Sequence, residues 1–141
     1  MGRRAELDLT FKAPVGLDRV LEELGKAGWS TVKDNEILYM SEDYDWNFAS
    51  PEDYAKVREE LDSTLANGDD AAISLWTAEG TGINLMLRPG MTRINVGLDL
   101  SRRTLDYSPG LTDLPWYLSK LLPSFARLGL VAIVARDEYE D

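Results

Sequence analysis

Residues 71–100 form the stretch AAISLWTAEGTGINLMLRPGMTRINVGLDL, which contains three short runs where apolar residues alternate with small or polar ones. Alternation with a period of two is typical of strands that bury one face. The segments 78–82 and 89–90 separate the runs and contain Gly or Pro, so each is predicted to be a short turn. Three consecutive strands joined by short turns predict an antiparallel meander, and this feature decides the fold class.

Helical spacing of apolar residues predicts three helices outside the meander. They cover residues 17–24, 54–66 and 114–128. Ser50-Pro51 precedes the second helix, and this pair is typical of a helix start because Ser can cap and Pro suits the first turn. Pro123 lies inside the third helix and should kink or divide it, since proline removes a backbone donor.

The remaining strands are predicted at residues 7–11, 29–33, 37–41 and 130–135. Asp34-Asn35 lies between the second and third of these and predicts a tight turn. The last strand is continuously apolar, so we expect it to be mostly buried, and residues 137–141 to form a mobile acidic tail. Residues 42–49 show no clean period and are expected to be irregular.

These elements predict an α+β fold in a single domain, residues 1–136. The expected order is β-α-β-β-α-β-β-β-α-β. Neighbouring strands are joined by hairpins rather than helical crossovers, so the sheet should be mainly antiparallel, with the three helices packed on one face.

Composition excludes several kinds of chemistry. The 141 residues include no Cys and no His, which removes thiol nucleophiles, thiolate zinc sites and the commonest general base. The net charge is −10, which argues against nucleic acid and against anionic membrane surfaces. No signal peptide or membrane span is evident, so a cytoplasmic protein is expected. We also expect no cofactor.

The negative charge is concentrated in one segment. Residues 34–70 contain twelve acidic and two basic residues, which account for the whole net charge of the chain. Aromatic residues are interleaved with these acids, and Tyr and Trp are enriched among the residues that dominate binding energy at protein interfaces. We therefore expect a binding surface for a basic protein. Its candidate residues are Glu42, Asp43, Tyr44, Asp45, Trp46, Phe48, Asp53 and Tyr54.

Other interpretations of this segment stay open at the level of sequence. Charged runs are usually solvated faces, and Trp46 and Phe48 could instead fold into the core. Glu42, Asp43 and Asp45 could hold Mg²⁺ or Ca²⁺, but the stretch lacks the Gly and the distant Glu of an EF-hand loop. We expect no metal here.

Three functions from different classes are compatible with the sequence. The first is a non-enzymatic protein-binding domain, most concretely an immunity (antitoxin) protein that neutralises a basic bacterial toxin such as a nuclease. The second is a small-molecule-binding or enzymatic domain with a pocket between sheet and helices, for which the candidate residues are Trp76, Arg88, Arg93 and Trp116. The third is a homo-oligomeric structural protein, for which a homodimer is the simplest form.

Overall fold

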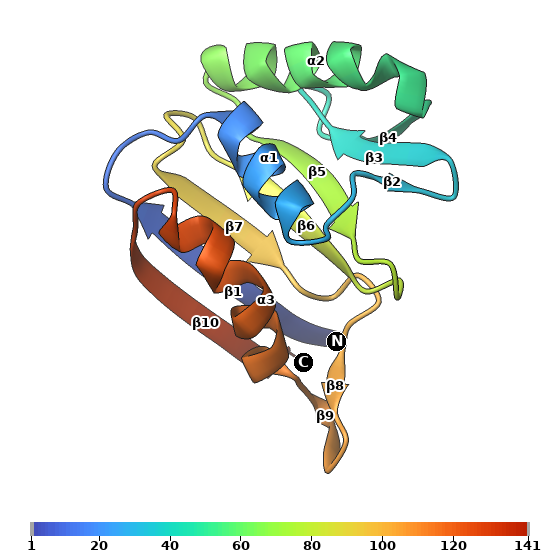
Figure 1. Ribbon diagram of the computed structural model, residues 1–141, viewed down its shortest axis with the longest axis vertical. Coiled ribbons are helices and arrows are strands. Elements are labelled where there is room, and N and C mark those ends of the chain that lie inside the picture. Colours follow the sequence, from blue (N-terminus) through green and yellow to red (C-terminus); the bar gives the residue numbers. More distant parts are fainter. Residues whose placement is uncertain (1, 141) are drawn as a thin grey trace.

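The computed structural model describes residues 2–140, which form a mixed α+β fold (Figure 1). The helices in this range are α1 (Leu17–Lys26), the short 3-10 helix η1 (Pro51–Asp53), α2 (Tyr54–Ala66) and α3 (Leu114–Ala126). The strands are β1 (Gly2–Phe11), β2 (Val32–Lys33), β3 (Glu36–Met40), β4 (Trp46–Ala49), β5 (Ala71–Trp76), β6 (Gly82–Leu87), β7 (Arg93–Gly97), β8 (Thr104–Leu105), β9 (Ser108–Thr112) and β10 (Leu130–Glu140). The expected order of elements is confirmed, with β4, β8 and β9 in addition.

Eight of these strands form one sheet in the order β10-β1-β7-β6-β5-β3-β2, with β4 paired to β3. The pairings among the described residues are antiparallel. The meander β5-β6-β7 is present as predicted. Strand β1 fits between β7 and β10, so the first and last strands of the chain lie side by side (Figure 1).

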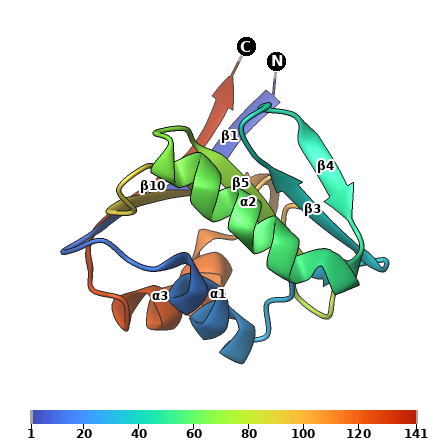
Figure 2. The same cartoon turned by 90° about the horizontal axis from the view of Figure 1, so that it is seen from above.

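The three helices cover one face of the sheet (Figures 1 and 2), as expected. In the core, Leu7 and Leu9 of β1 meet Leu24 of α1 and Phe125 of α3, all of which are almost completely buried. Apolar burial of this kind is the main favourable term in folding. The opposite face of the sheet is polar near β1, where Asn95 donates to Asp8 at 2.7 Å.

The turn between β2 and β3 has the geometry that its sequence predicts. Asp34 and Asn35 have φ angles of 52° and 62°. Two successive left-handed residues are characteristic of the hairpin turn that matches the twist of the strands, and Asp and Asn adopt this conformation more readily than most residues. The conformational preference of Asp34 and Asn35 therefore favours the turn that joins β2 to β3.

Residues 42–49, which were expected to be irregular, contain a strand, and so does the segment between the meander and α3, where no element was predicted. Strand β4 pairs residues 46–49 with 37–40 of β3, and β8 pairs with β9 in a separate two-stranded hairpin. These strands have two to five residues. Such short strands do not reveal a period in sequence, and their pairing depends on neighbours that are distant from the local pattern.

Pro123 does not divide the third helix. Helix α3 continues from Leu114 to Ala126 with Pro123 inside it. Proline frees the carbonyl group four residues earlier, which belongs to Ser119. Both Pro123 and Ser119 are exposed, so water can satisfy that carbonyl and the helix can continue.

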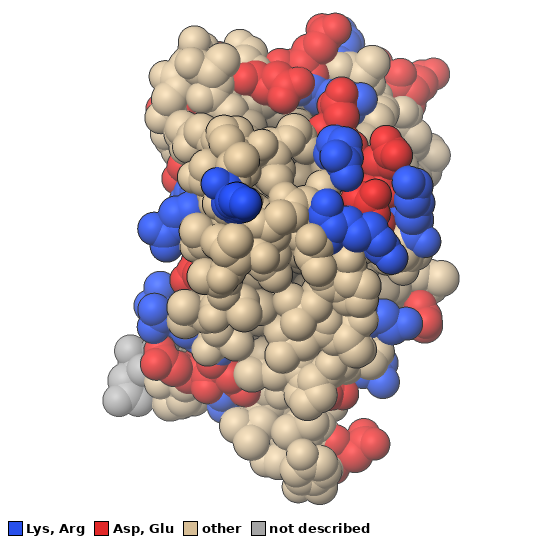
Figure 3. All heavy atoms as spheres, turned by 60° about the vertical axis from the view of Figure 1, so that its left-hand side comes forward, with Lys and Arg blue, Asp and Glu red and all other residues tan. Residues whose placement is uncertain are grey.

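The last strand differs most from the prediction. Instead of a mostly buried strand ending at Ala135, β10 continues to Glu140 and is mainly exposed. The acidic residues at its end are therefore part of the sheet rather than a separate tail, whereas Asp141 lies outside the described residues. The apolar run predicted two covered faces, but β10 lies at the edge of the sheet. Figure 3 turns this side of the molecule forward and shows a broad area without charged side chains.

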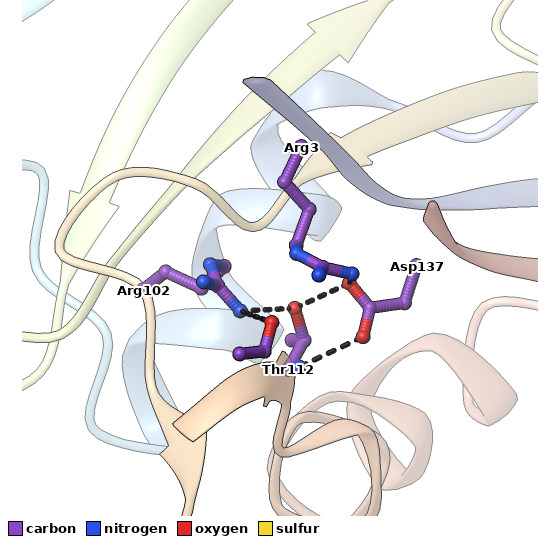
Figure 4. Close-up of polar contacts among 5 residues, drawn as sticks. Arg3, Arg102, Thr112 and Asp137 are labelled. Carbon is purple, nitrogen blue, oxygen red and sulfur yellow. Dashed lines mark hydrogen bonds and ion pairs between the residues drawn. The ribbon is translucent and has the colours of Figure 1, made fainter. Parts of the chain in front are cut away.

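A polar cluster joins the β8–β9 hairpin to the sheet (Figure 4). Asp137 of β10 forms an ion pair with Arg3 of β1 at 3.1 Å and accepts two hydrogen bonds from Thr112 of β9. Arg102 donates to the Thr112 hydroxyl at 2.9 Å. Three strands, β1, β9 and β10, thus meet at one largely buried carboxylate.

Candidate functional site

The turn between β3 and β4 presents the acidic residues at the centre of the predicted surface. Glu42, Asp43, Tyr44 and Asp45 are all exposed. Asp43 accepts hydrogen bonds from the backbone N–H of Asp45 at 3.1 Å and from the Asn47 amide at 3.4 Å. These hydrogen bonds join residues of the same turn and stabilise its conformation.

Tyr44 connects the same turn to the segment just before β5. Its backbone is left-handed, with φ at 57°, and its hydroxyl donates to Asp69 at 2.9 Å. The hydrogen bond to Asp69 raises the pKa of Tyr44 above its ordinary value. Tyr44 is still 56% exposed, so it remains accessible to a partner.

An open groove of about 580 Å³ lies between this hairpin and α2. Its lining residues are Tyr39, Ser41, Glu42, Asp43, Asn47, Lys56, Glu59, Glu60, Ser63 and Thr64. Four of these are acidic and one is basic, so the groove carries net negative charge. Burial, and after it the nearby Glu60 carboxylate, raises the pKa of Tyr39 on the groove floor. We call this feature the acidic groove.

The aromatic residues of β4 lie on the other face of the hairpin. Trp46 is 41% and Phe48 is 65% exposed. Because side chains alternate along a strand, both point away from Asn47 and the acidic groove. Phe48 lies opposite Leu38 and, together with Trp76, lines a small cleft of about 120 Å³. The structure therefore places Trp46 and Phe48 outside the core.

The candidate residues that belong to the β3–β4 hairpin are thus divided between its two faces. Glu42 and Asp43 line the acidic groove, whereas Trp46 and Phe48 are on the opposite side. A partner would have to extend around the edge of the hairpin to contact both of its faces.

Asp53 and Tyr54 lie where η1 meets α2. Asp53 is exposed and makes no side-chain capping hydrogen bond. Tyr54 packs partly against the core, and the Arg58 guanidinium lies 5.8 Å from its ring centre. Burial raises the pKa of Tyr54. Tyr54 therefore supports α2, and little of it is available to a partner.

The negative charge of the segment 34–70 is only slightly neutralised within the fold. Among residues 2–140, Asp70 is the one acid of this segment that forms an ion pair, with Arg88 at 2.6 Å. Arg58, one of the two bases of the segment, pairs with Asp18 of α1 outside it. The other base, Lys56, lines the acidic groove. Within the described part of the chain, no group of three or more acidic side chains has the arrangement of a metal site.

The four residues of the alternative pocket are not brought together. Trp76 and Arg88 lie toward opposite ends of the β5–β6 hairpin, and Arg93 is exposed at the start of β7. Trp116 packs edge-on against Trp29 and Tyr117, with the Arg103 guanidinium 4.7 Å from its ring centre. These contacts give Trp116 a structural role beside the core.

Sequence reasoning missed the contribution of α2 to the acidic groove. Helix α2 carries Glu59, Glu60 and Ser63 three, four and seven residues after Lys56. This spacing puts them on one polar stripe of the helix. The signal was present in the sequence, but its proximity to the turn at 42–45 depends on how α2 packs across β3 and β5.

No helix within residues 2–140 is both long and apolar enough to cross a membrane. Comparison with protein-family models, curated proteins and solved structures gave no significant match to this chain.

Proposed function

We propose that this chain is a non-enzymatic binding domain for a basic protein. The observation that carries the proposal is the acidic groove, whose hairpin also presents Trp46 and Phe48 in exposed positions. Unneutralised carboxylates attract a basic partner over distance and accelerate encounter. Exposed aromatic side chains supply contact area at low entropic cost once the partner arrives.

The most concrete form of the proposal is an immunity protein that neutralises a toxin. A nuclease needs a positively charged binding site for the phosphates of its substrate. The carboxylates of Glu42, Asp43 and Glu59 would occupy the positions of phosphates in that site. An inhibitor of this kind protects the cell where the toxin reaches its target, so the proposal includes a cytoplasmic location.

The test begins with affinity capture from the native host at low salt, followed by mass spectrometry and purification of the captured protein. Its binding to this chain is then measured by stopped flow at several salt concentrations. The groove variant is Glu42→Gln, Asp43→Asn and Glu59→Gln together. The matched control is Glu22→Gln, Glu79→Gln and Asp106→Asn, which changes the same number of exposed charges elsewhere.

We expect the groove variant to lower the association rate about tenfold or more and to flatten its salt dependence, whereas the control leaves both nearly unchanged. Trp46→Ala and Phe48→Ala should mainly increase the dissociation rate. Equal effects of the two charge variants, or a captured partner without a basic surface, would contradict the proposal. Relief of the partner's toxicity by co-expression of this chain tests the immunity function itself.

A further inference from the structure

Strand β10 leaves one whole edge of the main sheet open. It pairs with β1 along one side, from Leu130 to Glu140, and has no strand on its other side among the described residues. An edge strand presents a row of free N–H and C=O groups, which can template pairing with another strand.

The usual protection of such an edge is missing from the first six residues of β10, whereas Arg136, Asp137, Glu138 and Glu140 follow in its second half. No charged residue and no proline occurs from Leu130 to Ala135. Val131 is 62% and Val134 is 51% exposed, and Ile133 is also exposed. Natural edge strands are generally blunted by charges, proline, bulges or short length.

The opposite end of the sheet shows the contrast. Strand β4 has four residues, and Asp43 and Asp45 precede it. The edge at β4 is therefore short and charged, whereas the edge at β10 begins with six apolar residues, 130–135. We therefore expect a partner chain to cover the edge formed by β10.

The charges at the two ends of β10 indicate what this partner is. Lys12 is exposed beside the first residues of β10, and its backbone N–H donates to the Gly129 carbonyl at 2.9 Å. Arg127 lies nearby and pairs with Glu23 of α1 at 3.4 Å. Glu138 is exposed near the other end. A two-fold rotation that sets β10 antiparallel to itself brings Glu138 of one copy to the basic end of the other copy. The same operation sets apolar residues opposite apolar residues in the middle.

We propose that β10 pairs antiparallel with β10 of a second copy and joins the two sheets into one. Opposed residues of an antiparallel pair lie on the same face. With the two-fold axis near Val134, Ile133 therefore lies opposite Ala135 of the second copy. An isologous contact of this kind is the commonest form of protein oligomer. The acidic groove lies at the other end of the sheet, so the dimer presents two grooves and remains able to bind two partners.

The first test is sedimentation velocity of the purified chain, compared with Val134→Lys and Phe48→Lys. Both substitutions replace an exposed apolar side chain, one at each edge of the sheet. We expect the wild type and Phe48→Lys to sediment as dimers. Val134→Lys places two like charges at the axis and should raise the dimer dissociation constant by about tenfold or more. Circular dichroism checks that both variants are folded.

The second test uses the absence of cysteine from the chain. Opposed Cα atoms in antiparallel strands are about 4.5–5.5 Å apart, which suits a disulfide. Val134→Cys should therefore form a disulfide-linked dimer under mild oxidation much faster than Phe48→Cys. This readout does not depend on loss of folding.

A charge reversal tests the antiparallel register. Glu138→Lys should weaken the dimer, and adding Lys12→Glu to it should restore the affinity. A wild-type chain that remains monomeric up to about 1 mM would overturn the proposal. So would a Val134→Lys variant that dimerises as well as the wild type, or equal cross-linking of the two cysteine variants.

Discussion

Asp137 on β10 accepts two hydrogen bonds from one residue, Thr112 at the end of β9: one from the backbone N–H and one from the hydroxyl, both at 2.8 Å (Figure 4). This contact joins residues 25 positions apart and attaches the β8–β9 hairpin to the sheet. The carboxylate is 10% exposed and also pairs with Arg3. A side chain in this position can accept both hydrogen bonds only as a carboxylate, which makes its replacement informative.

We expect Asp137→Asn to lower the free energy of unfolding by about 1.5–3 kcal/mol, because an amide cannot accept from both groups of Thr112 and Arg3 loses its ion pair. Urea denaturation at neutral pH measures the change. Asp106→Asn is the matched control, since Asp106 is exposed in the turn between β8 and β9, and it should change stability by less than about 0.5 kcal/mol. Equal stability of the two variants would show that the cluster contributes nothing.

The pKa of Asp137 predicts a pH dependence. Burial acts to raise this pKa, but the hydrogen bonds from Thr112 and the Arg3 charge outweigh burial and hold it below its ordinary value. The unfolded chain then binds the proton more readily than the folded chain, so the stabilisation is complete above the unfolded pKa of about 3.9 and is lost as pH falls through the folded value.

The difference in unfolding free energy between wild type and Asp137→Asn should accordingly be constant from neutral pH to about pH 5 and shrink at lower pH. Urea denaturation at a series of pH values measures it. A difference that persists unchanged in acid would mean that the ionised form is not the stabilising one.

Tyr117 offers a test of the packing between α3 and the loop after β7. The ring is fully buried, and the hydroxyl accepts a hydrogen bond from the Arg103 backbone N–H at 2.8 Å. Tyr117→Phe leaves that N–H without its acceptor, so it should cost about 1–2 kcal/mol. Tyr107→Phe, at an 85% exposed position, should cost almost nothing.

Tyr117 also affects stability in base. Burial raises the pKa of Tyr117, so the folded state favours the neutral phenol. Stability should therefore fall as pH rises above the unfolded pKa of about 10, and Tyr117→Phe should lack this part of the fall. Denaturation curves of both proteins above pH 9 compare the two slopes.

Gly82 at the start of β6 is predicted to tolerate no side chain. A Cβ atom there would lie 2.7 Å from Nε1 of Trp76 and 2.9 Å from Cδ2 of Leu100. Gly82→Ala should therefore destabilise by about 1–3 kcal/mol through overpacking. Gly25→Ala in α1 has open space around it and should stabilise by about 0.5–1 kcal/mol, because alanine favours helix. Thermal denaturation should shift in opposite directions for the two variants.

Much of the fold was predictable because it depends on local patterns. The meander of β5, β6 and β7 follows from alternation and short turns, and the Asp34-Asn35 turn follows from residue preference. The candidate site was predictable in part. Its acidic turn was found from charge, but the contribution of Glu59 and Glu60 from α2 required the packing of that helix against the sheet.

Composition and periodicity determined by themselves that this chain is an α+β domain, that it lacks thiol and imidazole chemistry, and that its negative charge belongs to residues 34–70. Only the tertiary structure decided which apolar residues are covered. Trp46 and Phe48 of β4, and Val131 and Val134 of β10, have the sequence appearance of core residues and are exposed. A strand pattern records how side chains alternate, but burial depends on whether another layer or another strand lies beside them, and that is a property of the whole fold.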